Sequence, residues 1–193
     1  MRNRWGLNIR RGMYVRVSLA RGGHETGRVS RLERISGYGW RLILESGTSA
    51  SIDDAERDYS EQIEVMARHF LIAALWADCE EGTNPRASRQ AMDAARRLCA
   101  EFVDRIGPDM MAETLAAPGY GSHPDCSREW PQCAAMGHDL YLTSRGHGVG
   151  FWDRSELDPN DLGDRLTAAC KPCGFETEFY RGWLYVHLYK RGQ

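Results

Sequence analysis

The sequence predicts an α+β fold in which a small basic β-barrel (residues 1–66) precedes a larger α+β domain (residues 67–193). Short segments of alternating polarity, separated by glycine turns, fill the first part, as is typical of a small barrel. After Met66, apolar residues recur at helical spacing. The charge changes too. Ten arginines and two glutamates give residues 1–44 a net charge of +8, whereas seven acids and one arginine give residues 45–66 a net charge of −6.

The N-terminal part contains five segments that we expect to be strands. They are residues 13–20, 25–36, 40–45, 50–52 and 62–66. In the second segment, Val29, Leu32 and Ile35 follow one another at a spacing of three, which predicts a bulge or bend in a long strand. The stretch resembles an SH3-like barrel of the ribosomal or KOW type. The resemblance rests on residues 12–17 (GMYVRV), 27–29 (GRV) and 63–66 (IEVM).

The sequence pattern of the C-terminal part predicts three helices, a β-hairpin, a fourth helix and a terminal strand or hairpin. The first helix runs from residue 67 through Trp76. Ser88 can cap the second helix, and Gly107 with Pro108 separates it from a short third helix. The hairpin strands are residues 139–144 and 149–153, and the fourth helix begins near residue 160. Residues 179–189 form the last strand or hairpin, with a possible turn at residues 181–182.

The run GHDLYLTSRGHGVGFWDR at residues 137–154 is the most distinctive motif of the chain. It resembles a widespread group of small uncharacterised phage proteins with a Gly-His-Asp start, a Leu-Thr strand end, a Gly-His-Gly turn and a Phe-Trp-Asp strand. The resemblance spans about residues 67–189 and implies a phage or mobile-element origin. Small accessory phage proteins often bind host machinery, including defence systems. The expected partner is therefore a host protein or nucleoprotein complex, and inhibition of host defence is one possible outcome.

The predicted hairpin provides the candidate binding residues. Pairing its strands places Tyr141 opposite Trp152 on one face, where a cross-strand aromatic pair would add stability. The turn presents Arg145 and His147 beside glycines, and an exposed arginine and histidine suit contact with an anionic or polar partner.

Two pairs of cysteines suggest a zinc site. Cys126 and Cys133 lie in a Pro/Gly-rich loop with nearby histidines, and Cys170 and Cys173 have the spacing of a zinc knuckle. Alternatively, Cys170 and Cys173 continue the apolar face of the fourth helix, where a free cysteine acts as a small buried hydrophobe. We favour the second interpretation and expect no metal cofactor.

The arginines of the barrel suggest a second binding surface. Arg10, Arg11, Arg16 and Arg28 could contact nucleic-acid phosphates while neighbouring aromatic residues stack on bases. The alternative is a solvated arginine-rich surface that the acids of residues 45–66 partly neutralise.

The sequence lacks the motifs that mark several classes of enzyme. The chain contains no P-loop, no dinucleotide fingerprint and no local signature of thiol enzymes. We therefore predict a non-enzymatic binding protein. The alternatives are a nucleic-acid-binding protein of phage replication or regulation and a metal-dependent hydrolase or nuclease. No apolar run reaches the roughly 18 residues of a membrane span, and no secretory signal is recognisable, so we expect a cytoplasmic protein with no membrane partner.

Overall fold

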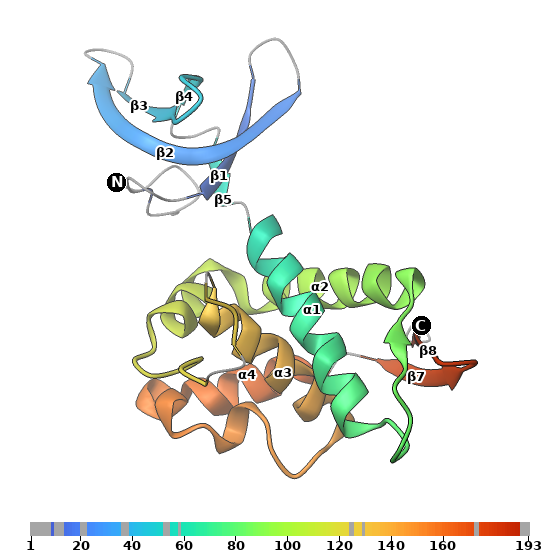
Figure 1. Ribbon diagram of the computed structural model, residues 1–193. Helices are drawn as coiled ribbons and strands as arrows, with labels where there is room; N and C mark the ends of the chain where they lie inside the picture. The colour runs from blue at the N-terminus through green and yellow to red at the C-terminus, as the bar shows by residue number, and fades with distance from the viewer. Residues whose placement is uncertain are drawn as a thin grey trace. The chain divides into compact units, whose positions relative to one another are not determined.

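A computed structural model of the chain describes residues 9, 14–19, 23–35, 39–51, 55–57, 59–123, 126–128, 130–171 and 174–189. The chain divides into two compact units, residues 1–60 and 61–193 (Figure 1). The boundary lies six residues before the predicted one, because residues 62–66 are helical and not the fifth strand of the first unit. Helices and small sheets together give an α+β protein, as predicted.

The N-terminal unit is one antiparallel sheet with the strand order β4-β3-β2-β1-β5. Its strands are β1 (Tyr14–Ser18), β2 (His24–Ile35), β3 (Gly39–Leu44), β4 (Ser49–Ser51) and β5 (Ala55–Arg57). The long strand β2 pairs with β1 through its first half and with β3 through its second half, and its register shifts between Val29 and Arg31. The irregularity predicted for this strand is therefore present.

One face of this sheet carries the apolar core. Val15, Val17, Val29, Leu42 and Leu44 are at most 1% exposed. Because side chains alternate across a strand, the residues between them point to the opposite face. This alternation determines which polar side chains of the unit reach solvent.

The C-terminal unit contains four α-helices, three 3-10 turns and a small sheet among its described residues. Its elements are α1 (Ser60–Ala77), β6 (Arg86–Ala87), α2 (Arg89–Ala116), α3 (Pro131–Arg145), η2 (Phe151–Asp153), η3 (Ser155–Leu157), η4 (Pro159–Asp161), α4 (Leu162–Cys170), β7 (Phe175–Tyr180) and β8 (Trp183–Leu188). The sheet order is β6-β8-β7, and the sheet stands beside the helices (Figure 1). None of the described helices is both long and apolar enough for a membrane span.

Helix α2 begins and bends where the sequence indicates. The Ser88 hydroxyl accepts a hydrogen bond from the Ala91 amide at 3.0 Å, which caps the helix. Gly107 has a φ of +70° and Pro108 follows it, so the two predicted helices form one kinked element. The core beneath these helices is aromatic. Phe102 of α2 stacks on Phe151 with ring centroids 5.6 Å apart.

The predicted hairpin of residues 139–153 is wrong, because residues 131–145 form helix α3. Gly146, with a φ of +74°, ends this helix, and its amide and that of His147 donate to the carbonyl of Leu142. This is a left-handed helix cap, so the glycine that suggested a strand turn is a C-cap residue. Phe151 then enters a short 3-10 turn, and its amide donates to the Thr143 hydroxyl at 3.1 Å.

The predictions for the fourth helix and for the C-terminal strands agree better with the structure. The apolar face of the fourth helix was predicted to contain Leu162, Leu166, Ala169 and Cys170; helix α4 buries all of these except Ala169, which is partly exposed. Strands β7 and β8 form an antiparallel hairpin whose turn is Arg181 and Gly182, both at positive φ.

Candidate functional site: a cleft beside α1 and α3

A cleft of about 650 Å³ lies in the C-terminal unit. Helices α1 and α3 form two of its walls, and the loop after α2 and the segment around Arg154 form the rest. Its lining combines apolar side chains with histidine, carboxylate, guanidinium and thiol groups. Such a mixture is common in binding sites.

A buried carboxylate forms the floor of this cleft. Asp139 of α3 is 1% exposed, and Arg154 contacts both of its oxygens, with Nε at 3.0 Å from each and Nη2 at 2.5 Å from Oδ1. The Tyr120 hydroxyl donates to Oδ2 at 2.8 Å. Three donor groups therefore occupy the lone pairs of Asp139, and a planar fork of this kind fixes the guanidinium in place.

Burial controls the acid–base properties of the floor. Burial raises the pKa of Asp139, and the hydrogen bonds from Arg154 oppose this rise. Burial, together with the charge of Asp139, raises the pKa of Tyr120 well above its usual value, so Tyr120 stays a neutral donor. The network connects the loop after α2, helix α3 and the chain after η2.

Two histidines stand side by side next to the floor. Nδ1 of His69 in α1 lies 3.3 Å from Nε2 of His138 in α3, so one imidazole donates to the other. Burial lowers the pKa of His69, and the nearby charges of His138 and Arg68 lower it further. The pair joins α1 to α3 while both rings are neutral.

The rim of the cleft is apolar and open. Trp76 is 77% exposed and Ile72 is 49% exposed. They lie one turn apart on α1, so their side chains are neighbours on the helix surface. The exposed carboxylate of Glu156 also lines the cleft.

The predicted tip residues Arg145 and His147 lie elsewhere, around Asp78 at the end of α1. Arg145 Nη2 lies 3.6 Å and His147 Nε2 lies 3.3 Å from Asp78 carboxylate oxygens, and Thr177 Oγ1 donates at 3.0 Å. The Tyr141 hydroxyl donates to the same carboxylate. Both predicted tip residues thus take part in a partly exposed polar cluster around Asp78 and are not presented on a hairpin tip.

The predicted pairing of Tyr141 with Trp152 is also wrong. Tyr141 is fully buried, packs on Phe70 and has its pKa raised by burial and by Asp78, whereas Trp152 is 52% exposed in η2. The reason is the helical conformation of residues 131–145, which removes the strand pairing.

The cysteines of the predicted zinc site occupy separate surroundings. Cys133 and Cys170 are buried, and burial raises the pKa of the Cys133 thiol to about 12. Cys126 lines the cleft, and Cys173 lies outside the described residues. Across the parts of the chain that the structure describes, no three His, Cys, Asp or Glu side chains are placed to hold a metal ion.

Of the four candidate arginines in the N-terminal unit, Arg16 is exposed on β1. Arg28 belongs to β2, but its side chain lies outside what the structure describes, as do Arg10 and Arg11 altogether. Strand β3 adds the exposed Arg41 on the same face of the sheet as Arg16.

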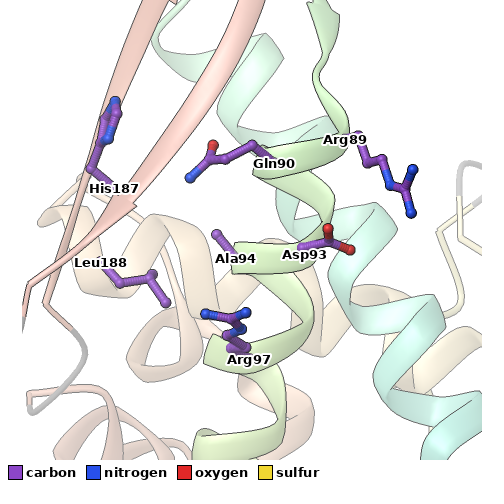
Figure 2. Close-up of a pocket in the computed structure, with 7 residues that line it drawn as sticks. All are labelled: Arg89, Gln90, Asp93, Ala94, Arg97, His187 and Leu188. Carbon is purple, nitrogen blue, oxygen red and sulfur yellow. The ribbon is translucent and has the colours of Figure 1, made fainter.

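A second hollow, of about 580 Å³, is lined by the start of α2 and the end of β8 (Figure 2). The side-chain amide of Gln90 exchanges two hydrogen bonds with the backbone of Val186 and so continues the pairing that β6 begins. Figure 2 shows Arg97 directed toward Leu188 and Arg89 directed to the other side of α2. The two guanidinium groups do not converge, and this hollow is the weaker candidate.

No local pattern in the sequence indicates the Asp139 network, because Tyr120, Asp139 and Arg154 are brought together only by the fold. The sequence does contain a signal that Trp76 is exposed. On a helical projection of α1, Ile72 and Trp76 fall outside the stripe that contains Met66 and Phe70.

The chain matches no protein-family model, and no curated protein or solved structure is significantly similar to it.

Proposed function

We propose that this chain is a non-catalytic binding protein whose cleft beside α1 and α3 receives a side chain of a partner protein. The observation that supports this proposal best is the exposure of Trp76 and Ile72 at the cleft rim. Tryptophan is enriched among the residues that dominate binding energy, especially beside a pocket. The proposal retains the expectation that the partner is a host protein or nucleoprotein complex.

The chemistry of the cleft favours a basic side chain of the partner. The Arg154 guanidinium is ion-paired with Asp139. The carboxylate of Glu156 at the rim makes only a long contact with Ser155 Oγ, at 3.4 Å. A lysine or arginine can stack on the face of Trp76 and pair with the Glu156 carboxylate. Cation–π contacts of this kind contribute about 0.5–2 kcal/mol, depending on desolvation.

The same geometry supports binding in preference to hydrolysis. The Asp139 carboxylate accepts hydrogen bonds from Tyr120 and Arg154, and His69 and His138 are hydrogen-bonded to each other. A general base needs a lone pair that faces the substrate. The lone pairs of Asp139 face Tyr120 and Arg154, and one nitrogen of each imidazole faces the other ring, so these groups suit a rigid support for a binding rim.

The test is affinity capture from a nuclease-treated bacterial lysate with the full-length protein, followed by binding measurements on each purified captured protein. Trp76→Ala and Glu156→Gln should weaken binding of the true partner, and Trp152→Ala, which alters another exposed tryptophan, should leave it unchanged. Thermal melts would verify that each variant is folded. A partner bound equally by the parent and by Trp76→Ala would overturn the proposal.

A second candidate function, nucleic-acid binding by the N-terminal unit, is favoured by the exposed Arg16 and Arg41 on the outer face of its sheet. The strand order β4-β3-β2-β1-β5 and the long bulged β2 support an SH3-like barrel for this unit. Arg31 shares the outer face but is paired with Glu33 at 2.9 Å.

This candidate requires that the full chain bind a labelled oligonucleotide at low salt, with affinity falling steeply as salt rises. The double variant Arg16→Gln/Arg41→Gln should bind more weakly, and its salt slope should be smaller by roughly one for each phosphate that an arginine no longer neutralises. Arg165→Gln, in the other unit, is the matched control. Equal binding by both variants would exclude this face.

A further inference from the structure

The β7–β8 hairpin leaves one edge of its sheet open. In the order β6-β8-β7, one side of β8 pairs with β7, and its other side is occupied by β6, the Ser88 amide and the Gln90 side chain. Strand β7 is thus an edge strand, and among the described residues no further strand pairs with it. An open edge of this kind is a template for another strand.

The register shows which backbone groups face outward. The Tyr189 amide donates to the Gly174 carbonyl at 3.1 Å, so position 174 faces β8, and by the alternation of an antiparallel ladder so do positions 176, 178 and 180. The backbone N–H and C=O groups of Phe175, Thr177 and Phe179 therefore point to the free edge.

The inner face of β7 is anchored to the helices. Phe175 is buried against Phe70 and Tyr141, and the Thr177 hydroxyl donates to Asp78. The edge is therefore held in an extended conformation before any partner arrives, which reduces the entropy lost on binding.

The outer face of the hairpin carries acids and exposed aromatic residues. Glu176 and Glu178 alternate along β7, and Tyr180 stands next to Trp183 across the turn, with exposed fractions of 51% and 44%. Glu178 contacts His187 at 2.9 Å, and both side chains are at least half exposed. Glu176 is hydrogen-bonded to the Tyr189 side chain, and both carboxylates remain exposed to solvent on the outer face of the hairpin.

We propose that β7 binds an extended basic segment of a partner protein by strand addition, with lysine or arginine side chains of that segment beside Glu176 and Glu178. Backbone hydrogen bonds to residues 175, 177 and 179 supply affinity, and alternate side chains supply specificity. The surface is separate from the cleft, and the inference does not depend on the proposed function of the cleft.

Charge complementarity decides between this occupant and a second copy of the chain. If two β7 strands pair antiparallel about Thr177, Glu176 of each faces Glu178 of the other, in two places. Like charges directly opposite each other destabilise a sheet, so self-pairing in this register is opposed. A basic strand in the same position places opposite charges together.

The experiment titrates the full-length protein with a labelled peptide of alternating arginine and threonine and with a matched peptide of alternating glutamate and threonine. Only the basic peptide should bind. Thr177→Pro removes an outward N–H without touching the ladder to β8, and it should weaken binding by roughly tenfold or more, because the hydrogen bond is lost and the proline ring obstructs the edge. Thr177→Val keeps the N–H, removes the same hydroxyl and should bind like the parent.

Two further measurements separate the alternatives. The double variant Glu176→Gln/Glu178→Gln should bind the basic peptide more weakly and with a shallower salt dependence. If Thr177→Pro fails to fold, a basic peptide N-methylated at alternate residues replaces it and should not bind the parent protein. Equal binding of the acidic peptide, or a dimer in sedimentation that Thr177→Pro dissolves, would overturn the proposal.

Discussion

At Asp139, a single buried carboxylate connects three segments that are distant in sequence. It accepts hydrogen bonds from Tyr120 and Arg154, and the Asp139 side chain is 1% exposed whereas that of Arg154 is 35% exposed. Removing one partner of a buried ion pair leaves the other charge buried without a partner. The resulting loss of stability is larger than the net stability that the pair contributes. The network therefore ties the loop after α2 and the chain after η2 to helix α3.

Phe151 and Trp152 are adjacent in sequence but differ in burial. Phe151 is fully buried against Phe102, so Phe151→Ala should reduce the free energy of unfolding by about 3–5 kcal/mol. Trp152→Ala removes a side chain that is half exposed and should reduce it by less than about 1 kcal/mol. Urea denaturation of both variants would check this. A larger effect of Trp152→Ala would contradict the arrangement of η2.

At the scale of elements, the sequence predicted most of the helices because their apolar spacing is local information. It failed at α3 because residues 139–144, taken alone, contain a short continuous apolar run, which suits a buried strand as well as a helix. Cys133, Ala134 and Met136 extend the same stretch with helical spacing, and Gly146 is equally suitable for a hairpin turn and for a helix cap. The cleft could not be predicted, because its polar contacts all join different elements.

Helices α1 and α3 approach so closely that only glycine fits at one position. A Cβ on Gly137 would lie 2.2 Å from the backbone carbonyl oxygen of Met66. Gly137→Ala should therefore force the helices apart and destabilise the protein by at least about 1–3 kcal/mol, despite the better helix propensity of alanine.

The matched control is Gly148→Ala, because a Cβ on Gly148 has no atom within 4 Å. Its thermal midpoint should stay close to that of the parent. If Gly137→Ala melts like Gly148→Ala, then α1 and α3 do not meet at this point.

The His69–His138 pair makes the contact between α1 and α3 dependent on pH. Because burial lowers the pKa of His69 below its usual 6.5, the unfolded chain takes up a proton on acidification before the folded protein does. The stability contributed by the neutral ring is therefore complete above pH 6.5 and is lost as the pH falls through the lower folded-state pKa.

We expect the unfolding free energy to fall between about pH 7.5 and about pH 5.5, and to fall less in His69→Gln than in the parent. His123→Gln, which replaces an exposed histidine of the same unit, is the comparison variant. Urea midpoints at both pH values provide the measurement. An equal loss in all three proteins would mean that other groups cause the pH dependence.

At the scale of the whole molecule, the chain has two cores that share no residue among those described. Val15, Leu42 and their neighbours form the first core within residues 1–60, and Phe102 and Phe151 belong to the second within residues 61–193. The charge pattern of the sequence does not coincide with this division, because the acidic segment of residues 45–66 extends across the boundary at residue 60.

Separate cores predict that a core truncation in one unit acts on the melting of that unit. Leu42 is fully buried, so Leu42→Ala should destabilise the N-terminal unit by about 2–5 kcal/mol. A unit of about 60 residues buries a smaller share of its surface than a larger one and has little stability in reserve, so it should melt first. Calorimetry of the full chain should therefore show Leu42→Ala lowering an early transition and Phe151→Ala lowering a later one. If either substitution lowered both transitions equally, the two units would unfold as one cooperative structure, and binding at either surface would have to be analysed as a property of the whole chain.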